Sequence, residues 1–167
     1  MFKLKVIQHA KVSKFELDEI IRIKSIAWEF PYKMQMEWIS KNLKGLDLHL
    51  LLYKNDNAVA YLNLISIELM IDTITFRALG VGNVCAIEKG KGYGAELMKQ
   101  TNQYISNENS IGLLFCKTSL TNFYKKFNWS IIEETKLNLT FQNENVKTML
   151  FNFNLPFHVL TFKEQIF

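Results

Sequence analysis

The spacing of apolar residues in the first quarter of the chain predicts one strand followed by two helices. Residues 3–8 form a short strand-like opening. Ser13 and Glu16 then match a capping box, in which the serine hydroxyl accepts a backbone amide and the glutamate bonds back to the serine amide. Apolar residues continue at helical spacing, so we expect a helix that Pro31 ends and a second helix over residues 34–43.

From residue 47 the apolar period changes to two, as in strands with one buried face. We expect strands over residues 48–52 and 59–67, joined by a turn at the Asn-Asp-Asn sequence of residues 55–57. A third antiparallel strand is expected over residues 71–79, and a short apolar run follows at 81–87. This part of the sheet is therefore predicted to be antiparallel up to the last run.

The second half of the chain alternates between helical and strand-like segments. A helix with one apolar face around residues 97–105 leads to a short buried strand at 111–116, and Ser119 begins a further helix. Two or three strands around residues 129–141 and 146–153 complete the sheet. Because a strand, a helix and a strand in succession normally place the two strands parallel, we predict a mixed α/β fold with a mostly antiparallel sheet.

The composition is that of a folded domain, with 167 residues, 49% hydrophobic and 22% charged. A chain of this length buries about 70% of the surface that its unfolded form exposes, which is enough for a substantial core. The sequence shows neither internal repeats nor linker-like stretches. We therefore expect a single domain over residues 1–167.

The charge balance does not favour a nucleic-acid partner. Lysine and arginine number 20 against 16 acidic residues, a formal net charge of +4. Only Arg22 and Arg77 are arginines, however, and arginine is the residue that reads bases and grips phosphates with two parallel bonds. The lysines are interleaved with acidic residues, as on an ordinary solvated surface.

The cysteines and the apolar stretches point to a cytoplasmic protein without a membrane partner. Cys85 and Cys116 lie far apart in apolar segments, and no histidine has metal-ligand spacing, so neither a disulfide nor a metal site is expected. The N-terminus lacks the apolar core of a signal peptide. The longest apolar stretch, residues 58–71, is too short and too polar to cross a membrane.

The most informative segment is a glycine-rich turn between the apolar run at 81–87 and the next helix. Gly90, Gly92 and Gly94 alternate there, and Lys89 and Lys91 add positive charge. Glycines allow the backbone amides to point in one direction at the positive end of a helix dipole. Such a turn is an anion site suited to phosphate.

Three phosphate-binding patterns compete for this turn. A Walker loop needs G-x-x-x-x-G-K-[ST], which is absent. The dinucleotide fingerprint G-x-G-x-x-G/A is formally met by Gly90, Gly92 and Ala95, but the next strand ends at Lys117 without the acidic residue that this fold requires. The third pattern is the Q/R-x-x-G-x-G/A pyrophosphate loop of acyl-CoA-binding acetyltransferases, matched by Lys89, Gly92 and Gly94, with lysine in the Arg/Gln place.

With a second motif downstream, the chain resembles the GNAT superfamily of N-acetyltransferases over about residues 79–129. Residues 113–116 look like the fifth strand of that family, and residues 122–129 look like its Φ-Y-x-K-x-G-F/W helix end. Asn128 stands where the family usually has glycine. Asparagine is the next-best residue for a left-handed helix terminus, so the same geometry is expected.

The resemblance implies a sheet of about seven strands, with helices on both faces and a splay between the fourth and fifth strands. Acetyl-CoA would lie in that opening as co-substrate, and no metal is implied. Gly80 and Gly82 fit this picture, since glycines within a strand often mark a bulge or the close approach of another backbone. The implied cofactor-binding residues are Val84, whose amide would face the thioester oxygen, and Lys89, Gly90, Lys91, Gly92, Tyr93, Gly94 and Ala95.

The implied reaction is direct attack of a primary amine on the thioester, with Tyr124 as the acid that protonates the leaving thiolate. Helical spacing alone would instead place Tyr124 on an apolar face with Leu120 and Phe123. A small-molecule amine is the expected acceptor, ahead of a protein terminus or lysine. A covalent route through either cysteine is the less favoured mechanism, and a non-catalytic acyl-CoA-binding module is the alternative function.

No residue stands out in the sequence as the base that would deprotonate the amine. The candidates are Glu29, Glu37, His49, Glu68 and Asp72. Each is more readily explained as a solvated surface group, and water or an already neutral amine would also serve.

The C-terminal segment, residues 155–167, is apolar for a terminus. An exposed patch of this kind would favour aggregation. We expect it to pack back onto the domain or onto a second copy of the chain in a homodimer.

Overall fold

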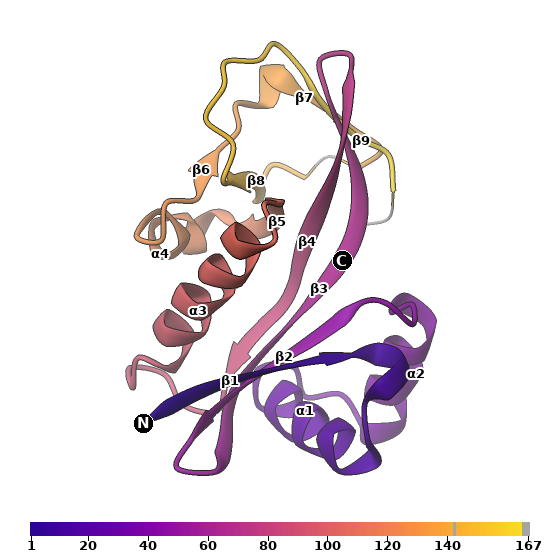
Figure 1. Cartoon of the computed structure of the whole chain (residues 1–167), viewed down its shortest axis with the longest axis vertical. Helices are drawn as coiled ribbons and strands as arrows, with labels where there is room; N and C mark the ends of the chain where they lie inside the picture. The colour runs from indigo at the N-terminus through magenta and orange to yellow at the C-terminus, as the bar shows by residue number, and fades with distance from the viewer. Residues whose placement is uncertain (142, 165–167) are drawn as a thin grey trace. The chain divides into compact units, whose positions relative to one another are not determined.

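The computed structural model describes residues 1–141 and 143–164 and divides the chain into two units. The first unit comprises Met1–Ile65 and Gly82–Thr101, and the second comprises Ser66–Val81 and Asn102–Phe167. Figure 1 labels the helices and strands. In chain order they are β1 (Phe2–Gln8), η1 (His9–Lys11), α1 (Lys14–Ala27), α2 (Tyr32–Asn42), β2 (Leu48–Lys54), β3 (Asn57–Ile71), β4 (Ile74–Ala86), α3 (Tyr93–Asn107), β5 (Ile111–Lys117), η2 (Thr118–Leu120), α4 (Thr121–Lys125), β6 (Ser130–Ile131), η3 (Glu134–Lys136), β7 (Leu137–Leu139), β8 (Val146–Phe151) and β9 (Leu160–Phe162).

The strand order confirms a mixed, mostly antiparallel sheet. Along the hydrogen-bonded path the order is β1-β2-β3-β4-β5-β8-β6, and β9 pairs with both β3 and β7. The pairs β1–β2, β2–β3, β3–β9, β5–β8 and β6–β8 are antiparallel, whereas β4–β5 and β7–β9 are parallel. The parallel pair β4–β5 brackets α3, as the strand-helix-strand pattern predicts. The splay of these two strands stays a prediction.

Strand β4 corrects one expectation from the sequence. Residues 71–79 and 81–87 were expected as two segments, but β4 is one continuous strand through Gly80 and Gly82. The chain reverses before it, at Asp72, which has a left-handed backbone with φ 53°. The Asp72 carboxylate accepts the backbone amides of His158 and Val159, both at 2.9 Å, and these bonds fix the reversal.

The capping box and the first hairpin turn are confirmed in the first unit. Ser13 Oγ accepts the Glu16 amide at 3.2 Å, and the Ser13 amide donates to Glu16 Oε2 at 2.7 Å. Helix α1 ends at Ala27, earlier than expected, and Pro31 precedes α2 instead. Asn55 and Asp56 both have positive φ, 48° and 65°, as a tight two-residue turn between β2 and β3 requires.

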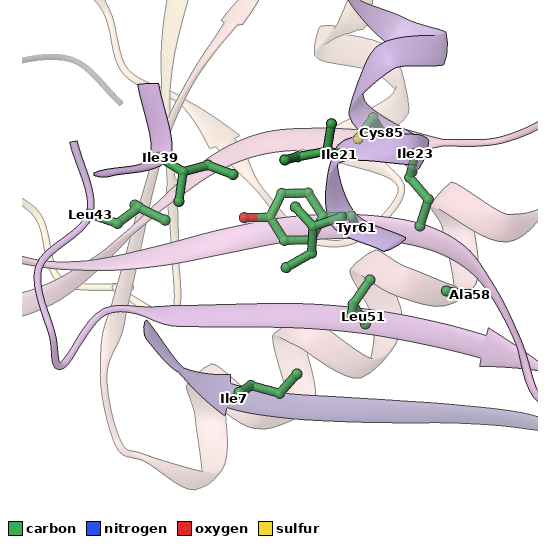
Figure 2. Packing of buried hydrophobic residues seen from close by; sticks show 10 residues of the cluster. Ile7, Ile21, Ile23, Ile39, Leu43, Leu51, Ala58, Tyr61 and Cys85 are labelled. Atoms are coloured by element: carbon green, nitrogen blue, oxygen red, sulfur yellow. The ribbon is translucent and has the colours of Figure 1, made fainter. Parts of the chain in front are cut away.

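Helices α1 and α2 cover one face of the strands in the first unit (Figure 1). The buried cluster between them is centred on Tyr61 of β3 (Figure 2). Ile21 and Ile23 come from α1 and Ile39 from α2, and strand residues such as Leu51 face them. Because each apolar side chain removed from water contributes about 1.5–3 kcal/mol, this cluster is the main reason that the two helices stay on the sheet.

A chain of polar groups passes through this apolar region. His9 Nδ1 lies 2.9 Å from His49 Nε2, and His49 Nδ1 lies 2.8 Å from the Tyr61 hydroxyl. His49 is fully buried. Burial and the nearby charge of His9 lower the pKa of His49 to about 4. The imidazole is therefore neutral in the folded protein at neutral pH.

In the second unit, Trp129 packs against a glycine of β5. Trp129 is 2% exposed and stacks on Phe151, with ring centroids 5.3 Å apart. Its indole N–H donates to Asn102 Oδ1 at 3.0 Å, and the Asn102 amide donates to the Phe127 carbonyl at 2.7 Å. A β-carbon at Gly112 would lie only 2.6 Å from the Trp129 ring. The indole therefore occupies the space that a side chain at Gly112 would need.

The segments after β5 are shorter and less regular than predicted. Ser119 lies within the 3₁₀ turn η2 rather than starting a helix, and the α-helical part is only α4. The stretch over 129–141 contains two short strands, β6 and β7, separated by η3.

The described part of the C-terminal segment packs back within the second unit. Leu160 and Thr161 of β9 pair with Ile71 and Met70 of β3. Ile166 and Phe167, which contribute to the apolar character of this segment, lie outside the described residues. The homodimer stays a prediction.

The packing at Trp129 predicts that Gly112→Ala lowers the free energy of unfolding by about 1–3 kcal/mol, because the new methyl group overpacks a rigid ring. The matched control is Gly45→Ala, where a β-carbon would meet Ala10 at an ordinary 3.4 Å. Urea denaturation of both variants tests this expectation. Equal effects of the two substitutions would contradict it.

The buried His49 predicts a loss of stability in mild acid. The unfolded chain takes up the proton at a pKa of about 6.5, whereas the folded protein takes it up only near 4. Stability is therefore present above pH 6.5 and falls by about 3 kcal/mol as the pH decreases to 4. Denaturant unfolding across this range measures the slope, and His49→Gln should flatten it. An unchanged slope in that variant would refute this origin.

Candidate functional site

The structure places the residues singled out in the sequence in two groups. Val84 and residues 89–95 lie in the first unit, from the end of β4 to the first turn of α3. Tyr124 lies in the second unit, within α4. Each group has its own local geometry.

The backbone irregularity expected in β4 is found at Asn83, a residue that the sequence did not single out. Asn83 has a left-handed backbone, with φ 54°. Its side-chain amide donates to Asn63 Oδ1 at 2.6 Å. Asn63 is fully buried, and among the described residues its own amide nitrogen has no hydrogen-bond acceptor. A left-handed residue interrupts the regular alternation of amides along a strand, immediately before the amide of Val84.

The turn between β4 and α3 has the backbone of an anion site. Gly90 and Gly92 both have positive φ, 81° and 76°. A β-carbon at either position would have no neighbour within 4 Å, so the space beside the turn is open. The Glu96 amide donates to the Gly92 carbonyl at 3.0 Å, which marks the first helical bond. The amides of residues 93–95 therefore have no acceptor within the helix and are available to a ligand.

The charged and aromatic side chains at this turn differ in their surroundings. Lys89 and Lys91 are exposed, and Lys91 Nζ lies 3.4 Å from a Glu88 carboxylate oxygen. Tyr93 packs edge-on against Phe2, with ring centroids 6.1 Å apart. The Lys54 ammonium lies 5.4 Å from the Tyr93 centroid. The side chain of Tyr93 therefore anchors the start of α3, while its backbone remains part of the turn.

Tyr124 is buried in a short aromatic helix end. It is 6% exposed, and its ring meets that of Phe123 at a centroid distance of 5.1 Å. Leu120 is 44% exposed and so does not share the buried face expected for both residues. Asn128 has the left-handed backbone predicted from the sequence, with φ 63°, and the Trp129 amide then donates to the Tyr124 carbonyl at 3.4 Å.

The structure also narrows the candidate bases and nucleophiles. His49 has both ring nitrogens engaged in the buried chain to His9 and Tyr61. Asp72 holds the reversal before β4. Glu37 is an exposed partner of Lys33 in α2. His49 and Asp72 are thus engaged in hydrogen bonds that hold the fold, and Glu37 is exposed to solvent. None of the three stands out as a catalytic base.

The two cysteines are poor nucleophiles in this structure. Burial raises the pKa of Cys85 to about 12, although Lys24 acts in the opposite direction. Burial raises the pKa of Cys116 to about 11. Since the thiolate is the reactive form, both thiols are protonated and inert near neutral pH.

Within the described residues, no group of three or more His, Cys, Asp or Glu side chains has a metal-binding arrangement. The same part of the chain contains no helix with the length and apolar character needed to cross a membrane.

Residues 8–132 match the family model described as an acetyltransferase (GNAT) domain. Comparison with curated protein sequences gives no match. Among solved structures, Escherichia coli ElaA is 21% identical with a TM-score of 0.66, over 90% of this chain and 99% of that one. A Pseudomonas aeruginosa acyl-CoA N-acyltransferase is 15% identical with a TM-score of 0.62, and the match covers 90% of this chain and 97% of that one. Escherichia coli YhbS, solved in complex with CoA, is 10% identical with a TM-score of 0.65, and the match covers 89% of this chain and 79% of that one.

The backbone at Asn83 gives a test that separates its conformation from its hydrogen bond. Asn83→Gly keeps the positive φ and loses the bond to Asn63, whereas Asn83→Ala also places a β-carbon in a strained conformation. We expect the alanine variant to be less stable than the glycine variant by about 1 kcal/mol. Denaturant unfolding measures the difference. The control is the exposed Asn154, whose backbone is not in the left-handed region. There the Asn154→Ala variant should not be less stable than the Asn154→Gly variant.

Proposed function

The chain belongs to the GNAT acetyltransferase family, and we propose that it transfers an acetyl group from acetyl-CoA to a primary amine. The observation that carries this proposal is the turn at the start of α3, where Gly90 and Gly92 with positive φ leave open space beside backbone amides. A pyrophosphate is the ligand that such amides suit, since they add to the positive end of the helix dipole. The CoA complex of the structural relative YhbS supports the choice of cofactor.

In this proposal the turn holds the pyrophosphate mainly through backbone groups. The amides of residues 90–95 supply the hydrogen bonds, including those of Tyr93, Gly94 and Ala95. Lys89 is exposed and has no ion pair among the described residues, so its ammonium is available to the phosphates. Lys91 contributes less, because Glu88 already neutralises part of its charge.

The amide of Val84 is the proposed hydrogen-bond donor to the thioester oxygen. Asn83 supports this role, because its left-handed backbone breaks the regular strand geometry one residue earlier. A donor fixed before the reaction stabilises the negative charge that develops on the oxygen in the transition state.

The chemistry requires two proton transfers. The neutral amine attacks the thioester carbonyl, the carbon–nitrogen bond forms, and the carbon–sulfur bond breaks as the tetrahedral intermediate collapses. Tyr124 is the proposed acid that protonates the departing CoA thiolate. The proton lost by the amine leaves through water, since no base is singled out among the residues considered. The high pKa values of Cys85 and Cys116 support direct attack over an acetyl-cysteine route.

We further propose that the two units act as one acetyltransferase domain over residues 1–167. Strands β3 and β4 and helix α3 each contribute residues to both units, which supports a single functional body. Cys85 and Cys116 are buried free thiols, as is typical of a reducing compartment such as the cytoplasm. The proposed acceptor is a small-molecule amine.

Tyr124→Phe tests the role of the hydroxyl. We expect acetyl-CoA to bind this variant as tightly as the wild type in calorimetry, while release of the CoA thiol in the presence of amines slows by at least about tenfold. Tyr104→Phe, at a half-buried tyrosine of α3, is the matched control and should retain the wild-type rate.

The outcomes of this experiment distinguish the alternatives. Wild-type turnover by Tyr124→Phe would remove the assignment of the acid. Binding of acetyl-CoA by the wild type without turnover on any amine would identify a non-catalytic acyl-CoA-binding module. Absence of acetyl-CoA binding would refute the proposed function altogether.

A further inference from the structure

The second unit contains a cavity of about 340 Å³ beside β5. This volume is at the lower end of the range for small-molecule sites, about 300–1,000 Å³. Apolar side chains form most of its wall. They are Phe115, Leu137, Leu139, Phe141 and Val146.

The cavity lies on the face of β5 opposite to Trp129. A β-carbon at Gly112 would point at the Trp129 ring, so Trp129 covers the Gly112 face of the strand. Successive residues of a strand point to opposite faces, and Phe115 is three positions further along. Phe115 therefore faces the other way, together with Thr148, its partner on β8, which also lines the cavity.

The cavity also begins where β5 leaves its pairing with β4. The pairs between these strands run from Ala78 with Ile111 to Val81 with Leu114. Phe115 is the next residue of β5. A molecule in the cavity would therefore contact β5 just beyond the last residue that pairs with β4.

The charges at the cavity favour a cation. Glu134 and Glu144 contribute carboxylates to the lining. Glu134 forms an ion pair with Lys147, whereas Glu144 is exposed and forms none among the described residues. Three other lysines are nearby, and none of them lines the cavity: Lys163 donates to Asn138, Lys136 lies over the ring of Phe157, and Lys117 is exposed opposite Val146. One carboxylate is thus left to meet a ligand with a single positive charge.

We propose that this cavity is the acceptor site and that it takes a primary amine carried on an apolar, ring-sized body. Glu144 holds the ammonium form, which loses its proton to water before the neutral amine attacks the thioester. The assignment of the ligand as acceptor rests on the proposed function. The preference of the cavity for an apolar ammonium compound does not depend on the proposed function, because it follows from the lining residues alone. Polyamines and amines with anionic groups fit this lining poorly, since they offer little apolar surface or the wrong charge.

Three probes with the same ring and different head groups test the proposal on the full chain, without CoA. They are 2-phenylethylamine, the neutral 2-phenylethanol and the anionic 3-phenylpropionate, titrated by NMR or calorimetry. We expect affinity to fall in that order. Glu144→Gln should reduce the advantage of the amine over the alcohol by up to about fivefold, the upper end of the range for an exposed ion pair. Leu139→Ala should weaken the amine and the alcohol by similar factors.

Glu133→Gln is the matched control, since Glu133 is an exposed neighbouring carboxylate that does not line the cavity. It should leave all three affinities unchanged. The same affinity for the amine and the alcohol in the wild type, or equal effects of Glu144→Gln and Glu133→Gln, would overturn the proposal. Failure to bind any of the probes would do so as well.

Turnover then tests the role of the ligand separately. With acetyl-CoA present, Glu144→Gln should raise the KM for 2-phenylethylamine with little change in kcat, because the carboxylate acts in binding. Selective binding of the amine by a protein that fails to bind acetyl-CoA would refute the proposed function and leave the cavity preference standing. Acetylation of other amines with no selectivity for the phenyl series would refute the acceptor assignment and leave the acetyltransferase activity standing.

Discussion

The turn from β4 into α3 depends on a backbone constraint, the need for two left-handed residues within three positions. Gly90 and Gly92 meet it without the cost of about 1–2 kcal/mol that a β-carbon imposes in this conformation. The same geometry brings the Glu96 amide to the Gly92 carbonyl and so starts the helix. The turn consequently places the backbone amides of residues 93–95 ahead of the first helical bond.

The packing of Trp129 on Gly112 has a comparable effect in the second unit. One face of β5 is closed by the indole, whose position is fixed by its bond to Asn102 in α3. Because the residues of β5 alternate, the opposite face can present Phe115 to a cavity without disturbing this contact.

Features specified by neighbouring residues were predictable from the sequence. The capping box at Ser13, the turn at Asn55 and Asp56, and the left-handed Asn128 each follow from the conformational preferences of a few adjacent residues. The left-handed Asn83 was not predictable, because an asparagine inside an apolar strand gives no sign of its backbone conformation. The long β4 was read as two segments for a related reason, since Gly80 weakens the strand pattern locally although the paired neighbours maintain it.

Features assembled from residues far apart in the chain could not be predicted from the sequence, for a different reason. His9 and His49 meet Tyr61 only because three separate elements pack together, and the cavity joins Phe115 to residues 134–148. The net charge of the sequence likewise does not show where charged groups gather in the fold. A net charge of +4 describes neither place, since lysines lie at the glycine turn, whereas Glu144 at the cavity has no ion pair within the described part of the chain. In the proposed function these two places would take opposite charges, the anionic cofactor and the ammonium form of the acceptor, which an overall balance cannot reveal.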